Sequence, residues 1–389
     1  MDDFDAALAT LEAQHLRRKR RIVQGPQGPF LTLDDRRYLS FCSNDYLGLA
    51  NHPALLAAAH DGLQRYGTGA AASALICGHS TAHETLELEL AAFVGMQRAL
   101  YFSNGYMANL GTISALVGVG DCVFSDRLNH ASLIDGARLS RADFKIYRHG
   151  DTDQLSRLLA KSTSPRKLVA TDAIFSMDGD LAPLPALLAL CEQHDAWLLV
   201  DDAHGFGVLG PAGSGSLRHF GLHSERLIYM GTLGKAAGVA GAFVAGHENL
   251  IAWLMQRART YMFTTANPAM LATAVSASLA IMAAQDWRRT HLQLLGAYLQ
   301  RALHGLPWPL MPSISAIHPL LVGDNRTAQL LMEQLRAQDI WVPAICPPTV
   351  PRATARLRIS LSALHTREHI DQLAQALKTA AMLCKEAQA

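Results

Sequence analysis

One lysine stands alone in a glycine-rich turn in the second half of the chain. The stretch "LIYMGTLGKAAG", Leu227 to Gly238, reads as a short apolar strand followed by a turn that holds Lys235, with no carboxylate in the ten residues after it. A buried lysine is costly unless it is paired or neutralised, and loss of solvation lowers its pKa. A lowered pKa is what an amine needs to attack a carbonyl and form an imine. The alternative interpretation is a surface lysine on a loop. The imine hypothesis therefore depends on whether other residues of the chain supply the partners that an imine needs.

Polar residues follow several other apolar runs of the chain. They are Asn104, Gly105 and Tyr106 in "FSNGYMANLG", His130 in "SDRLNHASL", Ser176 in "IFSMDGD", Asp201, Asp202 and His204 in "WLLVDDAHGFG", and Thr232 in "MGTLGK". The glycine–tyrosine pair precedes a helix start, where free backbone N–H groups favour an anion. A pyridine aldehyde cofactor needs a lysine, an acid for the ring nitrogen, a flat group against the ring and phosphate donors. Each residue alone is weak support for such a site, but together they supply all four requirements.

Alternating strand and helix patterns set the expected fold. Strands are predicted at 98–102, 121–126, 143–148, 167–175, 197–203, 226–231 and 241–246, separated by helical patterns. This alternation predicts an α/β fold with a mostly parallel seven-stranded sheet, in which ligands lie beyond the carboxyl ends of the strands. The 34 positions between Asp201 and Lys235 (235 − 201) suffice for one crossover helix and an adjacent strand. Three parts are expected: an N-terminal helix and hairpin arm (1–40), a large domain (41–284) and a smaller α+β domain (285–389).

Composition excludes several classes of protein. The chain has 389 residues, half of them hydrophobic and 17% charged, with a net charge of +1, so neither nucleic acid nor an acidic membrane is an expected partner. The six cysteines form no CxxC pair, which argues against a disulfide framework or a zinc site and favours a reducing compartment. The N-terminus fits no signal peptide, and the apolar run 266–284 is rich in Ala, Ser and Thr, typical of a packed helix. A soluble, cytoplasmic protein is expected.

Three short motifs suggest other functions but lack the residues those functions require. "GTLGKA" has neither the upstream glycine nor the Ser/Thr of a phosphate-binding Walker loop. "HTREH" (365–369) fits a loose metalloprotease pattern but leaves little chain for a third ligand. "LRRKRR" (16–21) is interpreted as a solvated helix that meets an acidic acyl carrier or a carboxylate, not as a nucleic-acid patch.

Over nearly its whole length the chain resembles the α-oxoamine synthase family of pyridoxal-phosphate (PLP) enzymes. The stretches that carry the resemblance are "FCSNDYLGLANHP", "FSNGYMANLG", "DRLNHASLIDGARLS", "IFSMDGDLAPL", "VDDAHGFGVLG", "GTLGKAAG" and "PPTVPRATARLRISLSALHT". The resemblance implies a type I aminotransferase-like fold and PLP as cofactor. "VDDAHG" with "PPTVP" favours the branch of biotin biosynthesis, which condenses L-alanine with a pimeloyl thioester of CoA or acyl carrier protein. A sister activity, condensation of glycine with a short acyl-CoA, stays open.

The resemblance also implies roles for single residues in cofactor binding. Lys235 would hold PLP as a Schiff base and move the Cα proton, Asp201 would pair with the pyridine nitrogen, and His130 would stack on the ring and stabilise an oxyanion. Ser176 and His204 would hydrogen-bond the ring hydroxyl region, and Thr232 with the Gly105 and Tyr106 amides would hold the phosphate. Thr264 and Thr265 would reach the phosphate of the second subunit, so a homodimer with shared active sites is expected.

Other positions would recognise the substrates. Arg358 would bind the alanine carboxylate with Asn44 and Thr349 nearby, and Arg17 (or Arg18) would face the acyl substrate. The chain departs from the family pattern at three places: "GTGAAASAL" (67–75) replaces a glycine-rich stretch, Cys346 stands where arginine is common, and Phe206 stands where threonine is common. Extra methyl groups in the first stretch would narrow the acyl site, while none of the three touches the imine chemistry.

Overall fold

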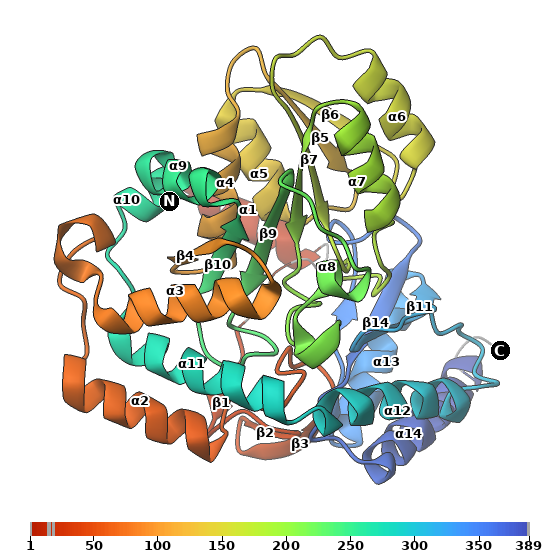
Figure 1. The fold of residues 1–389 in the computed structure, drawn as a ribbon. Coiled ribbons are helices and arrows are strands. Elements are labelled where there is room, and N and C mark those ends of the chain that lie inside the picture. Colours follow the sequence, from red (N-terminus) through yellow and green to blue (C-terminus); the bar gives the residue numbers. More distant parts are fainter. Residues whose placement is uncertain (1, 14–16, 18–19, 387–389) are drawn as a thin grey trace.

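A seven-stranded sheet forms the centre of the large domain. The computed structural model describes residues 2–13, 17 and 20–386 (Figure 1). The sheet has the order β4 (Arg98–Phe102), β10 (Ala242–Gly246), β9 (Leu227–Thr232), β8 (Trp197–Asp201), β7 (Lys167–Asp172), β5 (Cys122–Asp126) and β6 (Asp143–Tyr147). The five strands from β9 to β6 are parallel to one another, and β10 is antiparallel to both β4 and β9. The predicted mostly parallel sheet is therefore confirmed, and its strands are mostly one to three residues shorter than predicted.

Alternate residues of the central strands pack into two separate cores. In β8, Leu198 and Val200 join the core formed with α3 (Thr81–Val94), α6 (Thr152–Ala160) and α7 (Leu184–Gln193). Leu199 between them joins the opposite core, with α4 (Gly105–Leu116), α5 (Ala131–Ser140) and α9 (Glu248–Arg257). Successive side chains of a strand point to opposite faces, and both faces here are covered by helices, so the strands read as continuous apolar runs.

Helices at one end of the sheet connect the large domain to the C-terminal part. α2 (Pro53–Tyr66) and α3 pack against α11 (Ala269–Ala284), which is followed by α12 (Trp287–Ala302) (Figure 1). The predicted packed helix within 266–284 is α11. Among the described residues, no single helix has the length and apolar character to cross a bilayer, and α11 with α12 meets the criteria only as a pair bent by 68°. The remaining short helices are α8 (Ser216–His219), α10 (Arg259–Met262) and single turns at Ala74–Gly78 and Pro211–Gly213.

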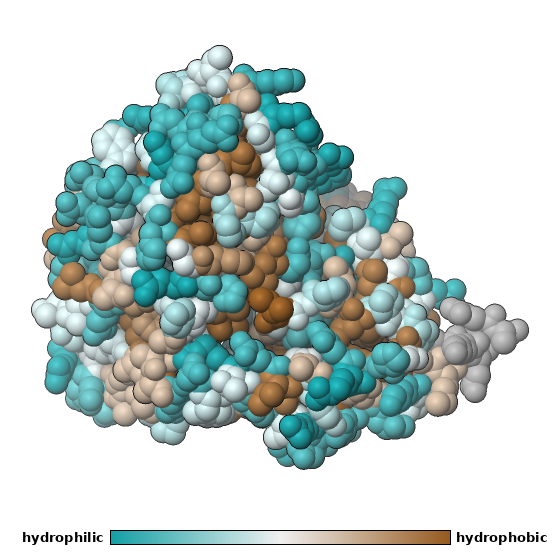
Figure 2. All heavy atoms as spheres, turned by 45° about the vertical axis from the view of Figure 1, so that its right-hand side comes forward, coloured by the Kyte–Doolittle hydropathy of each residue, from teal (hydrophilic) through white to brown (hydrophobic). Residues whose placement is uncertain are grey.

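The chain ends contribute two small sheets. β11 (Ile317–Gly323), β14 (Ala355–Ser360) and β13 (Ala344–Ile345) form an antiparallel sheet covered by α13 (Asn325–Ala337), against which α14 (Arg367–Glu386) packs. At the other end, α1 (Asp2–Ala13) precedes β1 (Val23–Gln24), β2 (Phe30–Leu33) and β3 (Arg36–Ser40), and β3 pairs in parallel with β12 (Ile340–Trp341). The N-terminal hairpin is thus joined to the C-terminal part. Figure 2 shows a face on which hydrophobic residues reach the surface in the middle, surrounded by hydrophilic ones.

Candidate active site

A cavity of about 190 Å³ lies at the carboxyl ends of the central parallel strands. Its lining consists of Gly105, Tyr106, His130, Ser132, Asp172, Ser176, Asp201, Ala203, His204, Met230, Thr232 and Lys235. All eight residues predicted to bind a cofactor from within one subunit are in this set. The structure thus brings together side chains that are up to 130 positions apart (235 − 105), because the carboxyl ends of parallel strands meet at one edge of the sheet.

Lys235 lies in the turn after β9, half-buried, with its Nζ 2.9 Å from Nε2 of His204. Burial lowers the pKa of Lys235 to about 8, although attraction to Asp201 and Asp172 opposes this shift. Gly238 closes the turn with φ of +71°, and a Cβ there would lie 2.6 Å from the backbone of Leu49. Only glycine fits such a close approach at positive φ. The lysine that the sequence singled out is therefore a partly desolvated amine held by a tight turn.

His204 belongs to a chain of hydrogen bonds that ends at Arg358. The Tyr46 hydroxyl donates to Oδ1 of Asn44 at 3.0 Å, and that oxygen also faces two nitrogens of Arg358 at 3.3 and 3.4 Å. Since the single hydroxyl proton of Tyr46 is used, its oxygen accepts from Nδ1–H of His204 at 2.6 Å. Burial, and after it the positive charges of Lys235 and Arg358, hold the pKa of His204 well below its usual value, so the ring is neutral. Its Nε2 then presents a lone pair to Lys235.

Two consecutive aspartates at the end of β8 point to opposite sides of the sheet. Asp201 faces the cavity, where its carboxylate accepts from Nδ2 of Asn109 at 2.7 Å and from the Ala203 N–H at 3.0 Å. Asp202 is fully buried on the other side and accepts from the Ser216 N–H and the Tyr229 hydroxyl, and burial raises its pKa to about 7. Of these two aspartates, only Asp201 is thus available to a ligand in the cavity.

A third aspartate, Asp172, lines the same cavity and was not singled out from the sequence. Burial, then repulsion from Asp201, raises the pKa of Asp172 well above its usual value, and its Oδ2 accepts from the His130 N–H at 2.9 Å. His130 caps α5, with Nδ1 2.8 Å from Oγ of Ser132. Burial lowers the pKa of His130, which favours a neutral ring at the cavity. The backbone position of this histidine is therefore fixed by the end of β7.

The predicted phosphate donors gather at the start of α4. The helix begins at Gly105, and Asn104 caps it by accepting from the Met107 N–H at 2.9 Å. A Cβ added to Gly105 would lie 4.0 Å from Oγ1 of Thr232, so both line one corner of the cavity. The unpaired N–H groups and the helix dipole at this end attract an anion. Tyr106 also lines the cavity, and its exposed side chain donates from its hydroxyl to Asp135.

Arg358 and Asn44 lie together beside the cavity. Nε of Arg358 donates to the Ser176 carbonyl at 2.5 Å, and NH1 donates to Ser360 at 2.8 Å, so the buried guanidinium is fixed in orientation. Thr349 is exposed on the loop between β13 and β14, and among the described residues its side chain forms no hydrogen bond with Arg358 or Asn44. The structure thus brings Arg358 and Asn44 together.

Two predicted residue sets lie away from the cavity. Thr264 and Thr265 line a second, smaller cavity with His83, Glu87 and Tyr101, and Thr265 is exposed, so a contact with phosphate would have to come from another copy of the chain. Arg17 is exposed and pairs with Glu12 at 3.5 Å, while Arg18 lies outside the described residues.

The departures from the family pattern and the histidine motif also lie outside the cavity lining. Ser73, in the alanine-rich stretch 67–75, bridges to Thr265, and Phe206 is buried against Phe93 and Phe243. His365 of "HTREH" is buried and bonds the Ser40 carbonyl and the Ser362 N–H, which gives it a place in the core packing.

Comparison with known proteins identifies the family. The model of the "Aminotransferase class I and II" family matches residues 36–377. The chain is 57% identical to "8-amino-7-oxononanoate synthase 1" of Polaromonas sp. (strain JS666 / ATCC BAA-500) over 97% of this chain and 95% of that protein. It is 55% identical to 8-amino-7-oxononanoate synthase of Nitrosomonas europaea, over 97% of this chain and 98% of the relative.

Solved structures agree with this assignment. Serine palmitoyltransferase from S. paucimobilis, with a bound PLP–myriocin aldimine, matches with a TM-score of 0.92 at 28% identity, over 98% of this chain and 97% of that one. The 8-amino-7-oxononanoate synthase of Francisella tularensis matches with a TM-score of 0.79 at 30% identity, over 90% of this chain and 99% of that one. The chain belongs to the class I and II aminotransferase family and, within it, to the α-oxoamine synthases.

Proposed function

We propose that this chain binds PLP in the strand-end cavity and catalyses the decarboxylative condensation of L-alanine with a pimeloyl thioester. The products are 8-amino-7-oxononanoate, CO₂ and the free thiol. The observation that carries the proposal is the convergence of Lys235, Asp201, His130 and the start of α4 on one cavity beside Arg358. The relatives at 55–57% identity, whose printed names are those of the same synthase, support the choice of substrates.

The residues of the cavity fit PLP in charge and in placement. Lys235 offers an amine with a pKa of about 8 for covalent attachment of the cofactor aldehyde. Asp201, fixed by Asn109, would keep a proton on the pyridine nitrogen, and His130 would cover the ring. The N–H groups of Gly105 and Tyr106, with Thr232, would hold the phosphate, and Ser176 and His204 would hydrogen-bond the ring hydroxyl region. When bound, PLP supplies an electron sink that stabilises negative charge at the substrate Cα.

The protein's own side chains then carry the remaining tasks. Arg358 and Asn44 bind the alanine carboxylate, with Thr349 approaching from its loop, and so hold the amino acid in one orientation. Lys235, once released from the cofactor, takes the Cα proton as general base and returns a proton after loss of CO₂. His130 stabilises the oxyanion that develops when the thioester carbonyl is attacked. Arg17 contacts the acyl substrate from the N-terminal arm.

The test is a steady-state assay of the purified chain with PLP. L-Alanine and pimeloyl-CoA, or the pimeloyl carrier protein, should release CO₂ and thiol in equal amounts, and comparing the two donors identifies the natural one. Replacing alanine by glycine removes one methyl group, for which we expect about a 10–200-fold lower kcat/KM. Faster turnover of glycine with acetyl-CoA would instead assign the chain to the sister activity, a glycine C-acetyltransferase.

Shared sites in a homodimer can be tested by mixing two inactive or weakened variants. In a mixed dimer of Lys235→Ala and Thr265→Ala chains, one site receives an intact Lys235 from one chain and an intact Thr265 from the other. Activity should therefore rise above that of either variant alone after the chains are mixed and reassociated. If Thr265 acts within its own chain, mixing restores nothing.

A further inference from the structure

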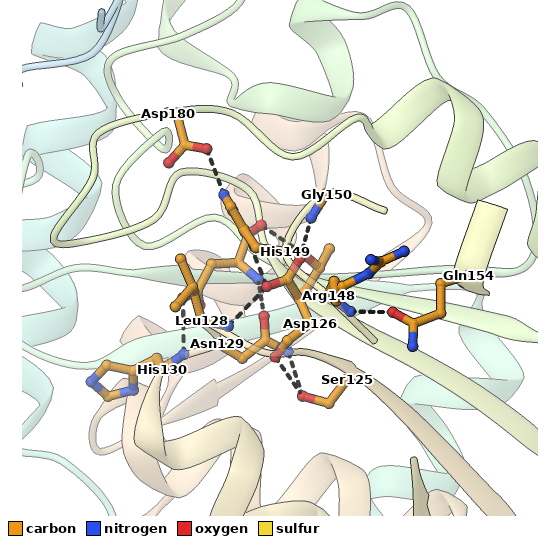
Figure 3. Close-up of polar contacts among 12 residues, drawn as sticks. Ser125, Asp126, Leu128, Asn129, His130, Arg148, His149, Gly150, Gln154 and Asp180 are labelled. Atoms are coloured by element: carbon orange, nitrogen blue, oxygen red, sulfur yellow. Dashed lines mark hydrogen bonds and ion pairs between the residues drawn. The ribbon is translucent and has the colours of Figure 1, made fainter. Parts of the chain in front are cut away.

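A histidine outside the cavity bonds two of the loops that form it. His149 follows β6, the edge strand, and its two ring nitrogens lie 3.1 Å from Oδ1 of Asp126 and 2.8 Å from Oδ2 of Asp180 (Figure 3). Asp126 ends β5 and Asp180 lies in the turn that follows β7. Because β5 lies between β6 and β7 in the sheet, His149 reaches across the loops of all three strands. We call this arrangement of Asp126, His149 and Asp180 the His149 clamp.

The first arm of the clamp leads to His130. The buried carboxylate of Asp126 also accepts from the N–H groups of Leu128 and Gly150, both at 2.9 Å (Figure 3). Four residues after Asp126 comes His130, which lines the cavity. The other side of this loop is fixed by Asn129, whose Nδ2 donates to the Ala170 carbonyl at 2.7 Å. The loop from Asp126 to His130 is thus held from β7 on one side and from His149 on the other.

The second arm leads to Ser176. The carbonyl of Asp180 accepts from the Phe175 N–H at 3.1 Å and so closes the turn that carries Ser176. The ring of Phe175 meets the ring of His149 edge-on, with centroids 4.4 Å apart. The Ser176 carbonyl in turn accepts from Arg358. A shift of Asp180 would therefore move Ser176, and with it the carbonyl that accepts from Arg358.

The charges in the clamp make both hydrogen bonds strong. The two carboxylates raise the pKa of His149 to about 10, so its ring carries a proton on each nitrogen at neutral pH. Hydrogen bonds between a charged donor and a charged acceptor are shorter and stronger than neutral ones. A neutral side chain in this place has no second donor with the same geometry.

We propose that His149 is a positioning residue, which fixes the loop bearing His130 against the turn bearing Ser176 and so sets the spacing of the cofactor cavity. This inference rests on the proposed function for its ligand, PLP, but the clamp itself is built only from residues of this chain. It predicts that loosening His149 weakens PLP binding without any change in a residue that lines the cavity.

The experiment uses the full-length chain with His149→Gln, Asp180→Asn and, as a matched control, His223→Gln at an exposed histidine far along the chain. PLP titration of each apoprotein gives the dissociation constant, and hydrogen exchange of the apoproteins reports on residues 127–131 and 174–181. We expect His149→Gln to raise the dissociation constant at least about tenfold and to speed exchange in both segments. Asp180→Asn should have a smaller effect, with faster exchange in 174–181 alone and a KM for the amino acid that rises more than kcat falls.

The outcomes separate the clamp from the proposed function. If the PLP dissociation constant of His149→Gln is within about twofold of the wild-type value and the hydrogen exchange rates of both segments are unchanged, His149 does not position the loops of the cavity. If the wild-type chain binds no PLP, the proposed function fails, while the exchange comparison still decides on the clamp. Should His149→Gln fail to fold, Asp180→Asn decides, because that side chain is 36% exposed and its loss leaves no buried charge.

Discussion

Two histidines near the ends of parallel strands differ in protonation state. His204 follows β8 and faces Lys235, with Arg358 close by, so burial and these cations hold its pKa well below the usual value. His149 follows β6 and faces Asp126 and Asp180, which raise its pKa to about 10. The first ring is neutral and offers a lone pair to an amine, while the second is a cation that donates twice.

Position along the sheet therefore does not decide what a histidine does. Both rings stand at the same edge of the sheet, but the sign of the neighbouring charges differs, and with it the protonation state. A neutral, tautomer-fixed ring suits the handling of a proton at a reacting amine. A charged ring between two carboxylates suits the fixing of loops.

Removal of the Lys235 amine, which faces His204, should have the largest effect of all the changes considered. We expect Lys235→Ala to lower the turnover number at least about a thousandfold, because covalent attachment and proton transfer are lost together. The visible absorbance of lysine-linked PLP should disappear as well, as measured by absorption spectroscopy. Lys161→Ala, at the exposed end of α6, serves as control and should match the wild type. Retained turnover in Lys235→Ala would contradict the assignment.

The next largest effect concerns the rate of PLP attachment to Lys235 and its dependence on pH. Only the neutral amine of Lys235 can attack the aldehyde, and its pKa is about 8. The rate constant for attachment of PLP to the apoprotein should rise about tenfold per pH unit below pH 8 and level off above it, as followed by stopped-flow absorbance. A rate that keeps rising to pH 10 would mean that burial does not lower the pKa of this lysine.

The tautomer of His204 should depend on Tyr46. In Tyr46→Phe the acceptor for the Nδ1 proton is lost, and we expect activity to fall about tenfold, the cost of one unsatisfied buried donor. Nitrogen NMR of the apoprotein should show His204 shifting away from the Nδ1–H form. Tyr66→Phe, at an exposed tyrosine of α2, is the matched control. An unchanged tautomer in Tyr46→Phe would remove Tyr46 from the chain of hydrogen bonds.

The smallest effect is expected for the contribution of His149 to the free energy of unfolding. Since the pKa of His149 is about 10 when folded, above the usual 6.5, its contribution is complete below pH 6.5 and is lost as the pH rises towards 10. The difference in unfolding free energy between wild type and His149→Gln should be about 1–2 kcal/mol at pH 6 and shrink by pH 10. Urea unfolding at several pH values measures it. A difference that does not change with pH would mean that the ring is not charged in the folded protein.

Much of the cavity could be predicted from the sequence because parallel strands end at one edge. Once "WLLVDD" and "LIYMG" are identified as neighbouring strands, Asp201 and Lys235 must lie near each other. The choice of Asp201 over Asp202 follows from the alternation of side chains only when the covered faces are known. Tyr46 lies inside "FCSNDYLGLANHP", but nothing in its spacing indicates a bond to His204.

The sheet, the family and the residue types at the strand ends follow from the sequence, since hydrophobic periodicity and strand-end position are local properties of the chain. Which of these groups are charged, and how they are held, depends on contacts between segments that are distant in the chain. The guanidinium of Arg358 meets Asn44 across 314 positions, and His149 meets Asp126 and Asp180 from different strands. Protonation depends on burial and on charges within a few ångströms, and those neighbours are fixed only when distant segments pack together.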